Sequence, residues 1–263
     1  MSWHKYLLIP RLILTSRGAA RSQEEAWERY WSTVRSMGST GDVLWDTDAP
    51  AEFALVAAQL RQHADLSLPI VDLGCGSGRQ ARSLAALAPR VVGIDGSAAA
   101  IAHAQRDAAG VEFRVADIAE PGLGERLAAE LGDANVHIRG VLHVIDDAQR
   151  RTVADTIAAV LGARGTLYLC ETNHTGDALD YLVTQGARPT FLPAVVDRLV
   201  RSGVRAPRHF GPAELAEFFP PPAWSVLAQG PTVLYGVPVE PGGALQRIPA
   251  LFAVLRRSGS YVP

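Results

Sequence analysis

Short apolar runs alternate with stretches of helical periodicity along most of the chain. Apolar runs begin near positions 70, 91, 111, 135 and 166, and the segments between them carry apolar residues three and four positions apart. This alternation predicts a parallel sheet whose strands are joined by helices. Two further runs, over 224–238 and 248–256, predict a sixth strand and an antiparallel seventh. The 263 residues, 48% of them hydrophobic, suit one large α/β domain.

The first apolar run leads directly into a glycine-rich turn. Residues 69–79 read PIVDLGCGSGR, and a helix is expected over 80–88. Glycine accepts positive φ and lets backbone N–H groups approach a ligand, so this order predicts a nucleotide-type site at the carboxyl edge of the sheet. The alternative is a tight turn without a ligand. The dinucleotide fingerprint G-x-G-x-x-G is not met, because Arg79 stands where its third glycine is expected.

The turn resembles motif I of the class I S-adenosylmethionine (SAM) methyltransferases, in which two apolar residues precede an acid and three alternating glycines. In that family the acidic residue contacts the methionine end of SAM, partly through water, and the glycines let the cofactor approach. The resemblance assigns Asp72, Gly74, Cys75 and Gly76 to SAM binding.

The next two strand ends extend this resemblance. Gly93-Ile94-Asp95 is similar to the element that holds the SAM ribose, which assigns Asp95 and the adjacent Gly96 to the cofactor. The alternative is that Asp95 only caps the helix expected from Ser97 to Ala109. Asp117-Ile118, at the exit of the third strand, resembles the step that meets the adenine.

Residues 135–147 resemble motif IV and its continuation, where many family members read Asp-apolar-apolar, a short link and Val-Leu-His-His-apolar. Here Asn135 replaces the acid, and His143 is present without the second histidine. An imidazole can accept a proton near neutral pH, so we predict His143 as the general base. The alternative is that His143 only bonds the backbone or shapes the pocket. Arg139 is assigned to the cofactor and, with His174, is a second candidate for orienting the substrate.

Aromatic residues gather in the segment before the glycine turn. Trp27 and Trp31 share one face of an expected helix, and Trp45 follows a flexible turn. This arrangement resembles the thiopurine methyltransferase group, whose N-terminal aromatic residues close over cofactor and substrate. We therefore assign Trp31 and Trp45 to the cofactor site and Trp27 to packing. Tyr30, His174 and Tyr181 are predicted substrate contacts.

The net charge and the cysteine content narrow the possible partners and the expected cellular location of the protein. The formal charge of −2 offers no general attraction to nucleic acid or membrane, and no stretch is long and apolar enough to span a bilayer. Cys75 and Cys170 allow no disulfide framework beyond one pair, which favours the cytoplasm. No clustered metal ligands or Gly-x-Ser-x-Gly nucleophile elbow is present, and we predict no metal site.

The sequence therefore predicts an α/β fold with a Rossmann-like seven-stranded sheet, helices on both faces and the seventh strand antiparallel. We expect an N-terminal arm over 1–22, disordered or folded over the active site or a partner subunit, and a single methyltransferase domain over 23–263. That domain includes lid helices in 23–66 and a substrate-binding insertion after strand five in 172–207.

The predicted function is methyl transfer from SAM to the oxygen, nitrogen, sulfur or carbon of a small molecule, by a monomer or homodimer. The Ala/Arg/Gly-rich composition is associated with bacterial secondary metabolism. Two alternatives stay open: a SAM-binding protein of this fold with a non-methyl reaction, and a nucleic-acid methyltransferase, which the lack of a basic patch disfavours.

Overall fold

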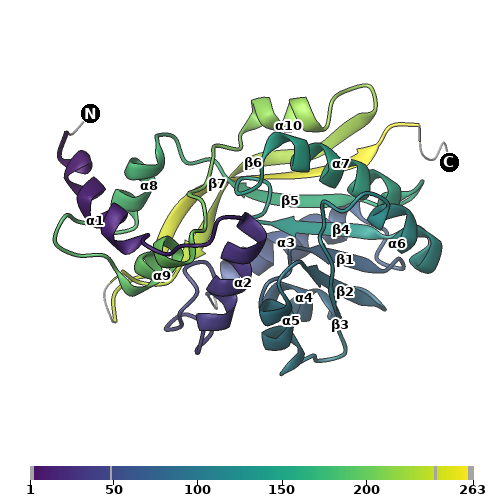
Figure 1. Ribbon diagram of the computed structural model, residues 1–263. Helices are drawn as coiled ribbons and strands as arrows, with labels where there is room; N and C mark the ends of the chain where they lie inside the picture. The colour runs from purple at the N-terminus through teal and green to yellow at the C-terminus, as the bar shows by residue number, and fades with distance from the viewer. Residues whose placement is uncertain (1–2, 48, 240–241, 260–263) are drawn as a thin grey trace.

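The computed structural model describes residues 3–47, 49–239 and 242–259. Residues 1 and 2 of the expected arm and residues 260–263 of the expected domain lie outside this description. The described chain folds around one seven-stranded sheet, flanked by helices (Figure 1).

The sheet has the strand order β3-β2-β1-β4-β5-β7-β6. Strands β1 to β5 are parallel, and β7 runs antiparallel to both β5 and β6, which confirms the predicted architecture. The strands are Ile70–Leu73 (β1), Val91–Asp95 (β2), Glu112–Val115 (β3), Asn135–Arg139 (β4), Leu167–Thr172 (β5), Trp224–Gly236 (β6) and Gln246–Arg257 (β7). From β1 the chain continues outward to β2 and β3 on one side, and from β4 it continues to β5 on the other side, so the order of strands switches between β1 and β4 and a crevice forms at their carboxyl ends.

Helices surround the sheet on both faces. They are Trp3–Leu8 (η1, a 3-10 helix), Ile9–Thr15 (α1), Gln23–Thr33 (α2), Pro50–His63 (α3), Arg79–Leu84 (α4), Ala98–Gln105 (α5), Leu123–Leu131 (α6), Asp147–Leu161 (α7), Ala178–Thr184 (α8), Ala194–Ser202 (α9) and Pro212–Phe218 (α10). Helix α5 ends at Gln105, short of the expected 97–109, and the chain then turns with positive φ at Ala109 and Gly110.

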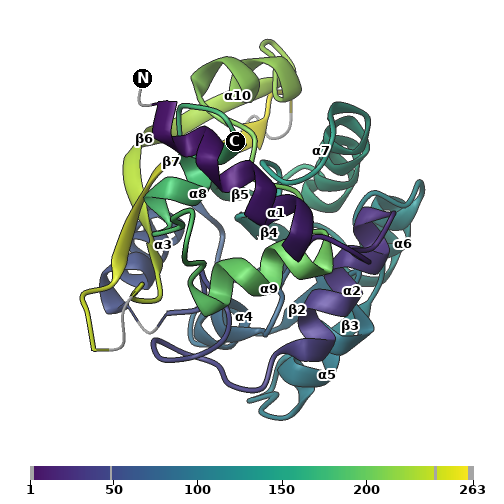
Figure 2. The same cartoon turned by 60° about the vertical axis from the view of Figure 1, so that its left-hand side comes forward.

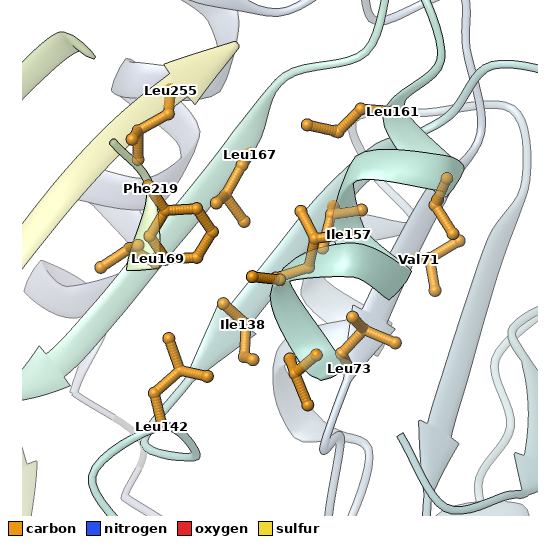
Figure 3. Close-up of a cluster of buried hydrophobic side chains, with 14 of the residues drawn as sticks. Val71, Leu73, Ile138, Leu142, Ile157, Leu161, Leu167, Leu169, Phe219 and Leu255 are labelled. Carbon is orange, nitrogen blue, oxygen red and sulfur yellow. The ribbon is translucent and has the colours of Figure 1, made fainter. Parts of the chain in front are cut away.

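Two apolar layers hold the helices on the sheet. On one face, Ile157 and Leu161 of α7 pack against side chains of β1, β4 and β5 such as Val71, Ile138 and Leu169 (Figure 3). On the other face, α3, α4 and α5 pack against β1, β2 and β5. Burial of both faces explains why the parallel strands read as continuous apolar runs.

A third group of helices covers the carboxyl ends of the parallel strands. It contains η1, α1, α2, α8 and α9, which lie together at one end of the molecule (Figures 1 and 2). Lys5 of η1 is buried, and its Nζ atom lies 2.8 Å from Asp177 and 2.7 Å from Asp180 at the start of α8. Residues 3–15 of the arm are therefore helical and tied to the 172–207 insertion, whereas the sequence left open a disordered arm.

Candidate cofactor and acceptor site

A cavity of about 400 Å³ opens at the carboxyl ends of β1, β2 and β4. All the residues that the sequence assigned to the cofactor border it: Trp31, Trp45, Asp72, Gly74, Cys75, Gly76, Asp95, Gly96, Asp117, Ile118 and Arg139. They come from separate strands and from the N-terminal segment, so only the folded sheet brings them together.

The glycine turn forms one wall of this cavity. Gly74 and Gly76 have φ of 72° and 53°, a conformation that residues with a side chain rarely adopt. A Cβ atom at Gly76 would lie 2.9 Å from the Trp31 ring, and one at Gly74 would lie 2.4 Å from Val141. The lack of side chains therefore keeps this wall open and lets Trp31 approach. Burial raises the pKa of the Cys75 thiol well above its usual value, so it is not a thiolate nucleophile.

Asp95 stands at the end of β2, facing the turn. Its Oδ2 atom accepts a hydrogen bond from the Gly76 amide and its Oδ1 atom accepts one from the Ser97 amide, both at 2.9 Å. The cap of α5 is the Ser97 hydroxyl, which accepts from the Ala100 amide, so Asp95 is not needed for capping. Burial raises the pKa of Asp95 to about 6, and the two amide hydrogen bonds oppose that rise.

Aromatic rings cover the cavity from the N-terminal side. Trp45 stacks on Tyr30 with ring centroids 5.5 Å apart and meets Trp27 and Trp31 edge-on. Trp27, which we assigned to packing alone, also borders the cavity. Tyr30 is fully buried and borders neither this cavity nor the one described next, so the predicted substrate contact of Tyr30 is not what the structure shows. The helix is turned so that Ala26 and Tyr30 face inward.

A second cavity, of about 130 Å³, adjoins the first. Both are bordered by Trp27, Trp45, Arg139, Gly140 and Val144. The rest of the second wall is mainly apolar and comes from α8, α9, residues 204–207, Leu44 and strands β5 to β7, with His143, Tyr181 and Arg205 as its larger polar residues. Tyr181 is the buried tyrosine of this wall.

His174, the other predicted substrate contact in the insertion, borders neither cavity. Its ring packs edge-on against Tyr181, with centroids 5.5 Å apart, and burial lowers its pKa. His174 therefore contacts Tyr181, which lines the smaller cavity, but lines neither cavity itself.

His143 is held by a carboxylate that the sequence reasoning missed. Its Nδ1 atom lies 2.6 Å from Oε2 of Glu171, near the end of β5. Glu171 is fully buried and also accepts hydrogen bonds from the backbone amides of residues 141, 142 and 143. A carboxylate only accepts, so Nδ1 carries the hydrogen and Nε2 is left as the free ring nitrogen. In the sequence, the only sign of this partner is that Glu171 is an acidic residue at the end of an otherwise apolar strand.

Arg139 lies between the two cavities and is neutralised. Its guanidinium forms a buried ion pair with Glu52 of α3 and donates to the Trp45 carbonyl at 3.3 Å. Burial alone would lower the pKa of Arg139, but the charge and hydrogen bond of Glu52 raise it. Arg79, a second cation at the cavity wall, likewise pairs with Asp46.

Two further findings concern metal ions and membranes. In the described ranges, no group of three or more His, Cys, Asp or Glu residues is placed to hold a metal ion. Of the described helices, none combines the length and the apolar character needed to cross a membrane.

Comparison with known proteins agrees with this geometry. The family described as "Methyltransferase domain" matches residues 70–165, which contain the glycine turn and the first four strands. No curated protein sequence matches the chain. A crystal structure of a SAM-dependent methyltransferase from Anabaena variabilis ATCC 29413 is 27% identical, with a TM-score of 0.78, and the match covers 91% of this chain and 96% of that one.

Two more distant structures share the fold. Magnesium protoporphyrin IX methyltransferase from Synechocystis PCC 6803, with bound S-adenosylhomocysteine (SAH), is 19% identical with a TM-score of 0.51, over 78% of this chain and 82% of that one. A structure concerned with the conversion of a disulfide bond into a thioacetal group during echinomycin biosynthesis is 21% identical with a TM-score of 0.59, over 81% and 83%.

The fold, the cavity and these comparisons define a class I SAM-dependent methyltransferase. The protein is an enzyme and its cofactor is SAM. The residues present suit that cofactor: a wall without side chains at Gly74 and Gly76, a carboxylate at the end of β2, and buried polar atoms on Asp72 and His137 that have no partner among the described residues.

Proposed function

We propose that this enzyme methylates a small, largely apolar molecule, with His143 as the general base. The observation that carries the proposal is the His143–Glu171 pair at the wall of an apolar cavity that adjoins the cofactor cavity. Bound SAM supplies an activated methyl group on a sulfonium, so the chain's own task is to position the acceptor, exclude water and remove a proton where the acceptor has one.

The cofactor would lie in the larger cavity. Asp95 is placed to accept hydrogen bonds from the ribose hydroxyls, and Asp117 and Ile118 border the part of the cavity beyond β3 where an adenine would lie. Trp31 and Trp45 would cover the cofactor as a lid, in the manner of the thiopurine methyltransferase group, and an aromatic face beside a sulfonium gains cation–π attraction.

His143 is arranged to accept a proton from the acceptor. Glu171 holds the ring in one orientation and in the tautomer with hydrogen on Nδ1, which leaves the Nε2 lone pair free. When Nε2 takes a proton, the positive charge that develops on the ring lies beside the Glu171 carboxylate, which stabilises it. Glu171 therefore acts as a positioning residue for His143.

The smaller cavity favours an acceptor that is small and carries no net charge. Its volume is about 130 Å³, and the guanidinium of Arg139 at its wall is already paired with Glu52. Arg205 also borders this cavity but is exposed to solvent, so a charged acceptor would leave water without an unpaired buried counter-charge among the described residues of this wall. Tyr181 borders this cavity, and its hydroxyl would supply one polar contact. Such a substrate fits the secondary metabolism and the cytoplasmic location that the sequence suggested.

The test is formation of SAH from SAM with a panel of one-ring phenols, thiols and amines, measured with wild type, His143→Ala and His209→Ala. His209 is a matched control, because it is exposed and borders neither cavity. The proposal predicts acceptor-dependent SAH formation that is lost in His143→Ala and kept in His209→Ala. Equal turnover in all three proteins would remove His143 from the mechanism, and SAM consumption without a methylated product would favour a non-methyl reaction.

A further inference from the structure

Asp72 and His137 form a buried polar pair beneath the cofactor cavity. They are register partners in the neighbouring parallel strands β1 and β4, so their side chains project from the same face of the sheet. Nδ1 of His137 lies 2.7 Å from Oδ1 of Asp72, and the two residues are 0% and 2% exposed. The sequence reasoning assigned Asp72 to the cofactor but did not single out His137.

The pair lies in a row of partners across the sheet. Gly93 of β2 is on one side of Asp72, with Phe113 beyond it, and Tyr168 of β5 is on the other side of His137. The imidazole is parallel to the Tyr168 ring within 4°, with centroids 5.6 Å apart. Stacking on Tyr168 and the bond to Asp72 together set the plane of the imidazole.

Each member of the pair keeps one polar atom without a partner. Oδ2 of Asp72 and Nε2 of His137 are buried and form no hydrogen bond within the described part of the chain, and both residues border the 400 Å³ cavity. Burying polar atoms without partners costs free energy, so such atoms at a cavity wall indicate that a ligand supplies the missing donors.

The chemistry of the two free atoms identifies the ligand group. The Asp72 carboxylate only accepts, so Nδ1 of His137 donates to it and Nε2 is an acceptor. Two acceptor atoms and one negative charge match an ammonium group, which has N–H donors and a positive charge. SAM carries such a group at its methionine end.

We propose that His137 positions the Asp72 carboxylate for the α-ammonium group of SAM, so that the two side chains bind that group as a unit. His137 fixes the rotamer of Asp72 through the Nδ1 hydrogen bond, and its own Nε2 offers the second acceptor. The inference depends on the cofactor alone, and not on His143 or on the identity of the acceptor.

The test compares two ligands that differ in the amino-acid part. SAH has the ammonium group, and 5′-methylthioadenosine has the same nucleoside and sulfur without it. Calorimetric titration of His137→Phe, which keeps a ring to stack on Tyr168, is expected to raise the Kd of SAH about tenfold or more while changing that of 5′-methylthioadenosine by less than about twofold. His137→Asn places an amide near the position of Nδ1 and is expected to retain SAH affinity within about threefold of wild type.

A double-mutant cycle adds a second criterion. If the pair acts as a unit, the loss of SAH affinity in Asp72→Asn combined with His137→Phe is clearly smaller than the sum of the two single losses. If His137→Phe does not fold, His137→Gln replaces it, because its amide lies one bond too far along the side chain to donate from the Nδ1 position. Parallel loss of both ligands, unchanged SAH affinity, or additive losses in the double variant would each overturn the proposal.

Discussion

Nδ1 of His143 lies 2.6 Å from Oε2 of Glu171, and the two residues come from the loop after β4 and from the neighbouring strand β5. Because Glu171 also accepts three backbone amides from residues 141–143, the carboxylate organises the loop as well as the ring. The loop thereby places His143 at the wall of the smaller cavity.

For the base, we predict that His143→Ala lowers kcat by about 10²–10⁴-fold while SAM affinity stays close to that of wild type. Loss of the base should also remove the acidic limb of the pH–rate profile. Steady-state kinetics with the best acceptor of the panel, together with calorimetry for SAM, measure both effects. Near-wild-type turnover would leave positioning alone as the mechanism.

For the carboxylate partner, Glu171→Gln keeps the shape of the side chain but removes the charge that stabilises a protonated His143. We expect kcat to fall by about 10-fold or more and KM for the acceptor to change little, because the residue does not border the acceptor cavity. Circular dichroism and the melting temperature check that the loop is retained. A change confined to KM would instead assign Glu171 to the shape of the pocket.

For cofactor binding, Asp95→Ala should weaken SAM binding by about 1.5–3 kcal/mol, the usual contribution of hydrogen bonds to a charged group. Asp107→Ala is the control, since that carboxylate is 80% exposed and borders neither cavity. Isothermal calorimetry measures both. Unchanged SAM affinity in Asp95→Ala, or binding of NADH by the wild type, contradicts the assignment.

The pKa of Asp95 predicts a dependence of stability on pH. Because folding raises this pKa from 3.8 to about 6, the folded state holds the proton more tightly than the unfolded chain. The associated stability is fully present below pH 3.8 and is lost as the pH rises through 6. At pH 7, the free energy of unfolding of Asp95→Asn should therefore be higher than that of the wild type. The pKa shift alone corresponds to about 3 kcal/mol. Because Asp95 is half-buried and solvent screens its charge, we expect a difference of about 1–2 kcal/mol.

Denaturant titrations of the protein without SAM at several pH values test this effect. The difference in free energy of unfolding between Asp95→Asn and wild type should increase from about pH 4 to about pH 7. SAM affinity of the wild type should move the opposite way and weaken as the pH falls below about 6, since only the ionised carboxylate accepts from both ribose hydroxyls. A gap that is constant with pH would show that Asp95 does not titrate in this range.

The aromatic lid should respond to the cofactor. Trp31 and Trp45 border the cofactor cavity, so SAH should change the tryptophan fluorescence, and the change should shrink in Trp45→Ala. Trp224→Phe is the control, because Trp224 packs on Phe219 and borders neither cavity. Hydrogen exchange over residues 24–46 that is indifferent to SAH would assign the segment to packing only.

The Arg139–Glu52 pair should dominate stability near the site. Arg139→Met leaves the Glu52 carboxylate buried without its cation, so the free energy of unfolding should fall by about 3–5 kcal/mol. Glu52→Gln combined with Arg139→Met should recover most of the loss, because no unpaired charge then remains. Urea denaturation of both variants distinguishes this outcome from a simple loss of packing, in which the double variant would be the less stable.

Local signals in the sequence determined the strands, the helices and the candidates at strand ends. Apolar runs ending in Asp72 and Asp95, and glycines at alternate positions, specify a parallel sheet with a ligand turn, because periodicity and φ preference act over a few neighbouring residues. All the cofactor candidates taken from those signals border one cavity.

Only the tertiary structure decided which side chains pair across the sheet and how helix α2 is turned. Glu171 reaches His143 from 28 positions along the chain and Asp72 meets His137 from 65, through strand neighbours that no local pattern specifies. Tyr30 and Trp31 are adjacent in the sequence, yet only Trp31 borders the cavity, since successive helix residues point in different directions. The rotation of α2 is set by its packing, because burial of Ala26 and Tyr30 depends on partners far along the chain.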